Sequence, residues 1–210
     1  MKFWLDKGIA GFRVDAITHM YETKAINNIL PDEPLSNNTD NPNEYGYLNH
    51  IHTTDQNETF ELVYEWREFL DNYKKTNGDD TKILMTESYS AIEMVIRYYK
   101  SGDREGTQLL FNFELMKQLN SESNAHDVVK AIYSWLDPMP EGHFTNWVVS
   151  FLTIPKCCFA NANVLFFLHF HKLGNHDGSR IGSRMGQEKI DLFNALVTLL
   201  PPGVKEANLK

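Results

Sequence analysis

The chain has 210 residues, a net charge of −8 and a pI near 5.5, with 42% hydrophobic and 23% charged residues. This composition is that of a globular domain and excludes a disordered chain. The negative charge argues against a nucleic-acid partner, whose phosphates would be repelled, and leaves neutral small molecules as the expected ligands.

The first part of the chain predicts a short helix, a strand and a long loop. Residues 2–7 are expected to end a helix, with Gly8 as its stop. Residues 9–16 alternate and are β-branched enough for a short buried strand. Residues 28–57 are rich in Asn, Pro and Asp and lack periodicity, so they predict a loop of the kind that is usually functional.

A helix is expected next over residues 59–73, with Asp55 or Asn57 near its N-cap. The elements that follow are a turn at 77–80, a strand at 82–87, a helix at 91–99, a strand at 108–113, helices at about 113–120 and 126–136, a loop at 137–146 and an amphipathic helix at 184–200. Strands that alternate with helices predict parallel βαβ units and an α/β fold.

The first candidate site lies at the end of the strand that carries the sequence GFRVDA. Arg13 and Asp15 are two residues apart, so their side chains emerge on the same face, where Gly11 is the next, small residue. An arginine beside an aspartate favours the ionised carboxylate that a nucleophile needs. An ordinary ion pair at a strand end is an equally good interpretation of these residues alone.

Two further segments carry polar groups that suit catalysis. Glu87 ends an apolar strand, and apolar neighbours tend to raise a carboxyl pKa, as a general acid requires. A glutamate that caps the helix after residues 88–90 is the alternative. The segment with Asn175, His176 and Asp177, followed by Arg180, is dense in hydrogen-bonding groups, but it also fits a plain turn.

Taken together, GFRVDA (11–16), Thr86-Glu87-Ser88 and LGNHD (173–177) resemble the catalytic motifs of glycoside hydrolase family 13, the α-amylase superfamily. The similarity runs over nearly the whole chain and is greatest to insect-type maltases, which are α-glucosidases. It implies a (β/α)₈ TIM barrel with the active site at the carboxyl ends of the strands.

The resemblance also implies a role for each residue. Asp15 would be the nucleophile, Glu87 the general acid and base, and Asp177 the carboxylate that binds the sugar hydroxyls. For substrate binding, Arg13 would keep Asp15 ionised, His176 would hydrogen-bond the sugar, and Arg180 would lie beside them. The implied reaction is retaining hydrolysis of terminal α-1,4-linked glucose from maltose and short oligosaccharides.

The chain departs from the family pattern at its beginning. It starts just before the fourth strand of the barrel, so strands four to seven are expected, without the first three strands, the small inserted domain and the eighth strand. Calcium, where relatives bind it, draws most of its ligands from that part, and we expect no metal or cofactor here. A barrel without half its strands exposes open edges, so the 210-residue chain alone is expected to be inactive on maltose.

A second departure divides the chain into residues 1–148, 149–172 and 173–210. The middle segment contains the adjacent Cys157 and Cys158, which are poor disulfide partners for each other, and no acidic residue. Relatives run continuously from Asn-Trp-Val into Leu-Gly-Asn-His-Asp, so we interpret 149–172 as a translated intron, and a genuine surface insertion is the alternative. Val149-Ser150 can be encoded by the consensus 5′ splice signal. From about residue 202 the tail also diverges.

Alternatives to an α-glucosidase remain within the same family. They are a non-catalytic member that serves as a membrane toxin receptor or transporter subunit, and a glucosyl-transferring enzyme similar to sucrose isomerases. The resemblance implies an extracellular or membrane-anchored location for the full-length protein, although no signal peptide is visible in this chain. Glycosylation sequons at Asn37 and Asn57 favour a secretory route.

Overall fold

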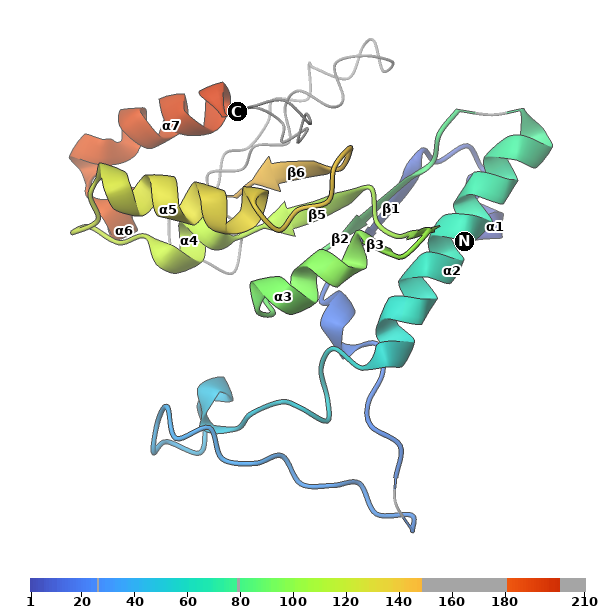
Figure 1. Ribbon diagram of the computed structural model, residues 1–210, viewed down its shortest axis with the longest axis horizontal. Helices are drawn as coiled ribbons and strands as arrows, with labels where there is room; N and C mark the ends of the chain where they lie inside the picture. Colours follow the sequence, from blue (N-terminus) through green and yellow to red (C-terminus); the bar gives the residue numbers. More distant parts are fainter. Residues whose placement is uncertain (26, 79, 149–180, 201–210) are drawn as a thin grey trace. The chain divides into compact units, whose positions relative to one another are not determined.

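The computed structural model describes residues 1–25, 27–78, 80–148 and 181–200. The chain divides into two compact units, Met1–Thr107 and Gln108–Lys210, and each contains a pair of parallel strands (Figure 1). The anomalous segment 149–172 lies outside the described residues. So do three predicted site residues, His176, Asp177 and Arg180.

The strand pair of the first unit consists of β1 (Gly11–Val14) and β2 (Ile83–Thr86), preceded by α1 (Lys2–Leu5). The strands are parallel, with Gly11 opposite Ile83 and Val14 opposite Thr86. Both predicted strands are therefore confirmed, although β1 is shorter than 9–16. A side-chain Cβ at Gly11 would collide with the carbonyl oxygen of Ile83, so this close pairing requires glycine.

The segment between β1 and the next long helix is irregular, as its sequence predicts. It contains two single turns of 3₁₀-helix, η1 (Ile17–His19) and η2 (Tyr45–Tyr47). The carboxylate of Glu33 accepts hydrogen bonds from the backbone N–H groups of His52, at 3.0 Å, and Thr53, at 2.9 Å. It also accepts one from the Thr53 hydroxyl at 2.7 Å, so a single side chain ties two distant parts of the loop together.

The long helix α2 spans Asn57–Asn77 and packs its apolar face into the first unit. The prediction that Asp55 or Asn57 lies near its N-cap is confirmed, because the N-cap is Gln56, which stands between them. The side chain of Gln56 accepts no hydrogen bond from the first turn of the helix. Asp55 lies outside the helix at a φ of 52°. One oxygen of its carboxylate, Oδ1, accepts a hydrogen bond from the buried Tyr98 hydroxyl at 2.9 Å, which ties the chain just before the helix to Tyr98.

The helix predicted over 91–99 is present as one α-helical turn followed by a 3₁₀ turn, α3 (Ile92–Val95) and η3 (Ile96–Tyr98). The ring centroids of Tyr98 and Phe60 of α2 lie 4.5 Å apart, which packs η3 on α2. A short antiparallel hairpin that the sequence did not predict follows. It is formed by β3 (Lys100–Ser101) and β4 (Arg104–Glu105).

The second unit is built on the parallel pair of β5 (Leu109–Asn112) and β6 (Phe144–Trp147). The expected strand at 108–113 is confirmed, but the expected loop at 137–146 is wrong at its end, because β6 begins inside it. Pro138, Pro140 and Gly142 gave that segment the composition of a loop. Only its final residues, from Phe144 on, adopt the extended conformation of a strand, and there Thr145, Asn146 and Trp147 are buried.

The crossover from β5 to β6 contains the two helices expected there, α4 (Glu114–Gln118) and α5 (Ala125–Leu136). A capping box fixes the start of α5, since Asn124 accepts N–H groups from its first turn and Asp127 accepts the Asn124 N–H. In each unit a helical crossover therefore joins two parallel strands, which is the βαβ arrangement of an α/β fold.

The last described segment contains α6 (Ile181–Met185), the 3₁₀ turn η6 (Gln187–Lys189) and α7 (Ile190–Leu199). The single helix predicted over 184–200 is wrong, because Gly186 has a φ of 93° and interrupts it. These helices share one apolar cluster with α4, α5 and β6. Its buried residues are Leu115, Leu119, Ala131, Ile132, Trp147, Ile181, Met185, Phe193 and Val197.

Candidate active site

The carboxyl ends of β1 and β2 bring two of the predicted catalytic acids together in the first unit. The parallel register continues past the strands, because the N–H of Glu87 donates to the Val14 carbonyl at 3.0 Å. The N–H of Ile17 then donates to the Glu87 carbonyl, also at 3.0 Å. Asp15 and Glu87 therefore follow adjacent strands at the same edge.

Arg13 links the two acids through one atom. Its Nη2 lies 2.8 Å from Oδ1 of Asp15 and 2.7 Å from Oε2 of Glu87. Because both contacts are made by the same nitrogen, the distance between Oδ1 of Asp15 and Oε2 of Glu87 cannot exceed the sum of the two contact distances. That limit is compatible with the roughly 5–5.5 Å between the two carboxyl groups of retaining glycosidases.

The two carboxyl groups have different surroundings. The Asp15 side chain is 65% exposed, whereas that of Glu87 is only 6% exposed. Burial, together with the neighbouring Asp15 carboxyl, raises the pKa of Glu87, and Arg13 offsets only part of this rise. Of two acids in one site, the one with the raised pKa stays protonated to higher pH and therefore suits the role of proton donor.

One carboxylate oxygen of Glu87 is left without a hydrogen bond among the described residues. Its Oε1 is buried and, within the described part of the chain, has no hydrogen-bond partner. Unsatisfied buried polar atoms are uncommon in folded proteins and call for an explanation. The unpaired oxygen belongs to the same side chain whose pKa is raised.

The backbone immediately after Asp15 is in an unusual conformation. Ala16 has a φ of 46° in the left-handed region, which costs a non-glycine residue about 1–2 kcal/mol. The surroundings hold it there, because the next residue, Ile17, is fully buried and bound through its N–H to Glu87. Strain of this kind concentrates at functional sites, and here it fixes the direction in which the chain leaves Asp15.

The structure separates the alternatives that the sequence left open. The Arg13–Asp15 ion pair exists, but it is part of a larger contact, since Arg13 also binds Glu87. Glu87 does not cap the helix that follows, because the N-cap of α3 is Ala91. The bond from Arg13 to Glu87 was missed. Only the strand register could have indicated it, because that register places Asp15 and Glu87 side by side after the paired residues Val14 and Thr86.

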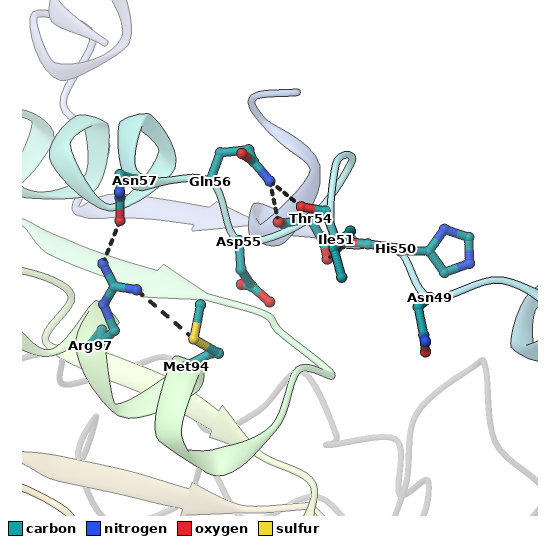
Figure 2. A pocket seen from close by; sticks show the side chains of 9 residues that line it. All are labelled: Asn49, His50, Ile51, Thr54, Asp55, Gln56, Asn57, Met94 and Arg97. Atoms are coloured by element: carbon teal, nitrogen blue, oxygen red, sulfur yellow. Dashed lines mark hydrogen bonds between the residues drawn. The ribbon is translucent and has the colours of Figure 1, made fainter. Parts of the chain in front are cut away.

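A separate hollow lies elsewhere in the first unit, between the end of the loop and α3, with a volume of about 500 Å³. Figure 2 shows its lining, which is Asn49, His50, Ile51, Thr54, Asp55, Gln56, Asn57, Met94 and Arg97. Arg97 donates to Oδ1 of Asn57 at 2.9 Å, and Gln56 donates to the carbonyls of Ile51 and Thr54 at 2.8 Å. These polar groups therefore bind one another and not a common point inside the hollow.

The second unit carries two buried amides at the carboxyl ends of its strands. Oδ1 of Asn146 accepts the N–H of Asn112 at 3.0 Å, and Oδ1 of Asn112 accepts the N–H of Glu114 at 2.9 Å. These bonds fix the turn from β5 into α4. The absence of a metal or cofactor stays a prediction. Among the described residues, no three or more His, Cys, Asp or Glu side chains gather as metal ligands would.

Comparison with known proteins gives one matching family, described as the alpha amylase catalytic domain, which matches residues 1–204. Maltase A2 of Drosophila melanogaster is 43% identical over 202 residues, which are 96% of this chain and 31% of the relative. The salivary alpha-glucosidase of Anopheles gambiae is 39% identical over 202 residues, covering 96% of this chain and 30% of the relative. The chain thus spans about a third of the length of these relatives.

The fold is similar to that of a solved hydrolase. The trehalose-6-phosphate hydrolase of Bacillus licheniformis superposes with a TM-score of 0.50 at 20% identity, covering 90% of this chain and 28% of that one. At this identity the likeness concerns the fold alone. It agrees with the parallel strand pairs and helical crossovers of both units and with the expected partial TIM barrel.

Proposed function

Because the chain belongs to the α-amylase family of catalytic domains, we propose that it carries two catalytic acids of an α-glucosidase, Asp15 and Glu87. The reaction is the hydrolysis of terminal α-1,4-linked glucose from maltose and short oligosaccharides with retention of configuration. The names of the relatives, a maltase and an alpha-glucosidase, support the substrate class.

In the first step, a carboxylate oxygen of Asp15 bonds to the anomeric carbon while the bond from that carbon to the leaving oxygen breaks. Glu87 gives its proton to the leaving oxygen, so the aglycone departs as an alcohol. In the second step, Glu87 takes a proton from water, whose oxygen displaces Asp15. Two inversions restore the original configuration at the anomeric carbon.

Arg13 has two tasks in this proposal. It forms an ion pair with Asp15, the carboxylate that attacks, and its Nη2 holds both carboxylates at one spacing. Asp177, His176 and Arg180 would bind the sugar from the segment after β6. Asp177 would contact the hydroxyl groups of the distorted ring and stabilise its positive charge.

The observation that carries the proposal is the shared contact of one arginine nitrogen with one exposed and one buried carboxylate. A retaining glycosidase needs this asymmetry, because one acid must be ionised while the other is protonated. The similarity to a salivary enzyme supports a secreted or cell-surface location. No helix in the described ranges is both long and apolar enough to cross a bilayer.

The test places these residues in a relative of full length. In a chimera, residues 1–148 of this chain replace the segment of Drosophila Maltase A2 to which they align, and the 210-residue chain alone serves as the negative control. We expect the chimera to hydrolyse maltose and 4-nitrophenyl α-glucoside. A soluble, folded chimera without activity would contradict the proposal and favour a non-catalytic member of the family.

Product analysis distinguishes a hydrolase from a transferase with the same acids. With sucrose as substrate, the proposed enzyme releases free glucose and fructose. Conversion of sucrose to an isomeric disaccharide would instead identify a glucosyl-transferring enzyme.

A further inference from the structure

The structure distinguishes the two glycosylation sequons of the chain. Both have the sequence Asn-X-Thr, at residues 37–39 and 57–59, and sequence alone ranks neither above the other. We propose that Asn37 carries an N-linked glycan and that Asn57 does not. The inference rests on the proposed secretory location, because the glycosyl donor is present only on that route.

Asn37 lies in an open part of the loop. Its side chain is exposed and, among the described residues, makes no hydrogen bond, and its φ is 59°. Asparagine tolerates this left-handed conformation better than most residues. The N–H of Asn38 donates to the Ser36 hydroxyl at 3.0 Å, which shapes a local turn that presents Asn37 outward.

The hydroxyl of the first sequon is also accessible. Thr39 is partly exposed, and its Oγ1 accepts a hydrogen bond from the N–H of Asn41 at 3.2 Å and donates none within the described ranges. Its proton therefore remains available for the enzyme that reads the sequon. A glycan on Asn37 would extend into solvent without displacing a side chain.

The second sequon is folded into a helix. Asn57 is the first residue of α2, a helix of 21 residues, and its Oδ1 accepts a hydrogen bond from Arg97 at 2.9 Å (Figure 2). Thr59 is fully buried, and its Oγ1 has no partner in the described part of the chain. A transferase that must hold the threonine hydroxyl would have to unwind the first turn of α2.

The order of events during synthesis favours the same site. A helix of about 20 residues forms within about a microsecond once its residues are available, whereas the chain grows by roughly 5–20 residues per second. The segment of α2 can therefore be helical before the transferase acts. The segment around Asn37 has no regular structure to withdraw it.

The modification itself is a group transfer. Nδ2 of Asn37 forms a bond to the anomeric carbon of a lipid-pyrophosphate-linked oligosaccharide, and the bond from that carbon to the pyrophosphate oxygen breaks. The amide loses one proton, and the lipid pyrophosphate is the leaving group. No oxidation or reduction takes place.

The test uses the full chain expressed in insect cells behind a cleavable secretion leader, so that its result does not depend on the natural location. Glycans are removed with a glycoamidase in ¹⁸O-labelled water, which converts each occupied Asn to a labelled Asp that mass spectrometry locates. We expect the label at residue 37 and a mobility shift that Asn37→Gln and Thr39→Ala both abolish. The matched variant Asn57→Gln should leave that shift unchanged.

Thr39→Ala is informative because it removes the hydroxyl and leaves Asn37 in place. Total membrane-associated chain is analysed together with secreted chain, so a variant that folds poorly still gives a result. Label at residue 57 with none at 37 would overturn the proposal, and so would a targeted chain without label at either position. Neither result would bear on the glucosidase proposal, which the chimera tests separately.

Discussion

Nη2 of Arg13 lies 2.7 Å from Oε2 of Glu87, although the two residues are 74 positions apart in the chain. The same nitrogen contacts Oδ1 of Asp15 at 2.8 Å, so one guanidinium forms ion pairs with both acids. An exposed salt bridge contributes little to the free energy of folding. Glu87 is buried, however, and removing the partner of a buried carboxylate leaves an uncompensated charge. Arg13 is therefore the residue through which the electrostatics of the site can be changed without removing either acid.

Arg13→Met in the chimera should lower kcat/KM by about 100-fold, because the two carboxylates are no longer held at one spacing. It should also move the alkaline limb of the pH profile upward. Arg13 lowers the pKa of Glu87, so its loss raises that pKa further and keeps Glu87 protonated to higher pH. The measurement is the pH dependence of kcat/KM on maltose.

The matched control is Arg104→Met, since Arg104 pairs with the exposed Glu61 on the surface of the same unit. It should leave both the rate and the pH profile unchanged. An Arg13→Met chimera with the parental alkaline limb would show that Arg13 does not act on Glu87.

Gly11→Ala should destabilise the first unit by about 1–3 kcal/mol, the usual cost of overpacking. The added Cβ collides with the carbonyl of Ile83, which belongs to the backbone of the paired strand and cannot rotate away. Urea unfolding should show a lower midpoint. Gly46→Ala is the control, because a Cβ at that position meets nothing within 4 Å. Equal midpoints for the two variants would contradict the observed strand pairing.

Glu33→Gln should release the loop that Glu33 ties together. Hydrogen bonds to a charged group contribute about 1.5 kcal/mol, so exchange of the His52 and Thr53 amide protons should become about 10-fold faster. Hydrogen exchange at neutral pH measures this directly. Asp32→Asn changes the neighbouring exposed acid and should have no effect.

The same anchor has a defined pH dependence. Burial opposes ionisation of Glu33, but hydrogen bonds from Thr53 and His52 outweigh it and lower the pKa of Glu33. Its contribution is therefore complete above the ordinary carboxyl pKa and is lost as the pH falls through the lowered value. Protection of the two amides, corrected for intrinsic exchange, should disappear in that acidic range and not near neutrality.

The parts of the fold that were predictable depend on local pattern. The segments GFRVDA and ILMTE indicate the ends of β1 and β2, because in each a mostly apolar run is followed by one acidic residue. The missed features depend on distant partners or on one backbone angle. The carboxylate of Asp55 binds the hydroxyl of Tyr98, which lies 43 positions away in the chain, and Gly186 divides the last helix through its positive φ. No local pattern could indicate that Arg13 binds Glu87.

We propose that residues 149–172 arise from a retained intron, because this segment contains no acidic residue and the resemblance to glycoside hydrolase family 13 implies that Val148 and Leu173 are neighbours in relatives. Transcripts of the gene should include a form that joins the codon of Val148 directly to that of Leu173. Sequencing of full-length transcripts, aligned to the genome, provides the measurement. The proposal is wrong if every spliced transcript retains these codons, and the segment is then a genuine surface insertion.

The most direct test of the catalytic assignment compares two leaving groups in the chimera. Glu87→Gln should lose about 10²–10⁴-fold in activity on maltose, whose leaving oxygen needs a proton. The same variant should still release about one equivalent of fluoride from α-glucosyl fluoride in a rapid first turnover, because fluoride departs without a proton and only the later hydrolysis of the intermediate needs Glu87 as a base, whereas Asp15→Asn should fail on both substrates. A Glu87→Gln chimera whose first-turnover release of the leaving group is equally impaired on maltose and on the fluoride, or an Asp15→Asn chimera that retains activity, would contradict the catalytic assignment.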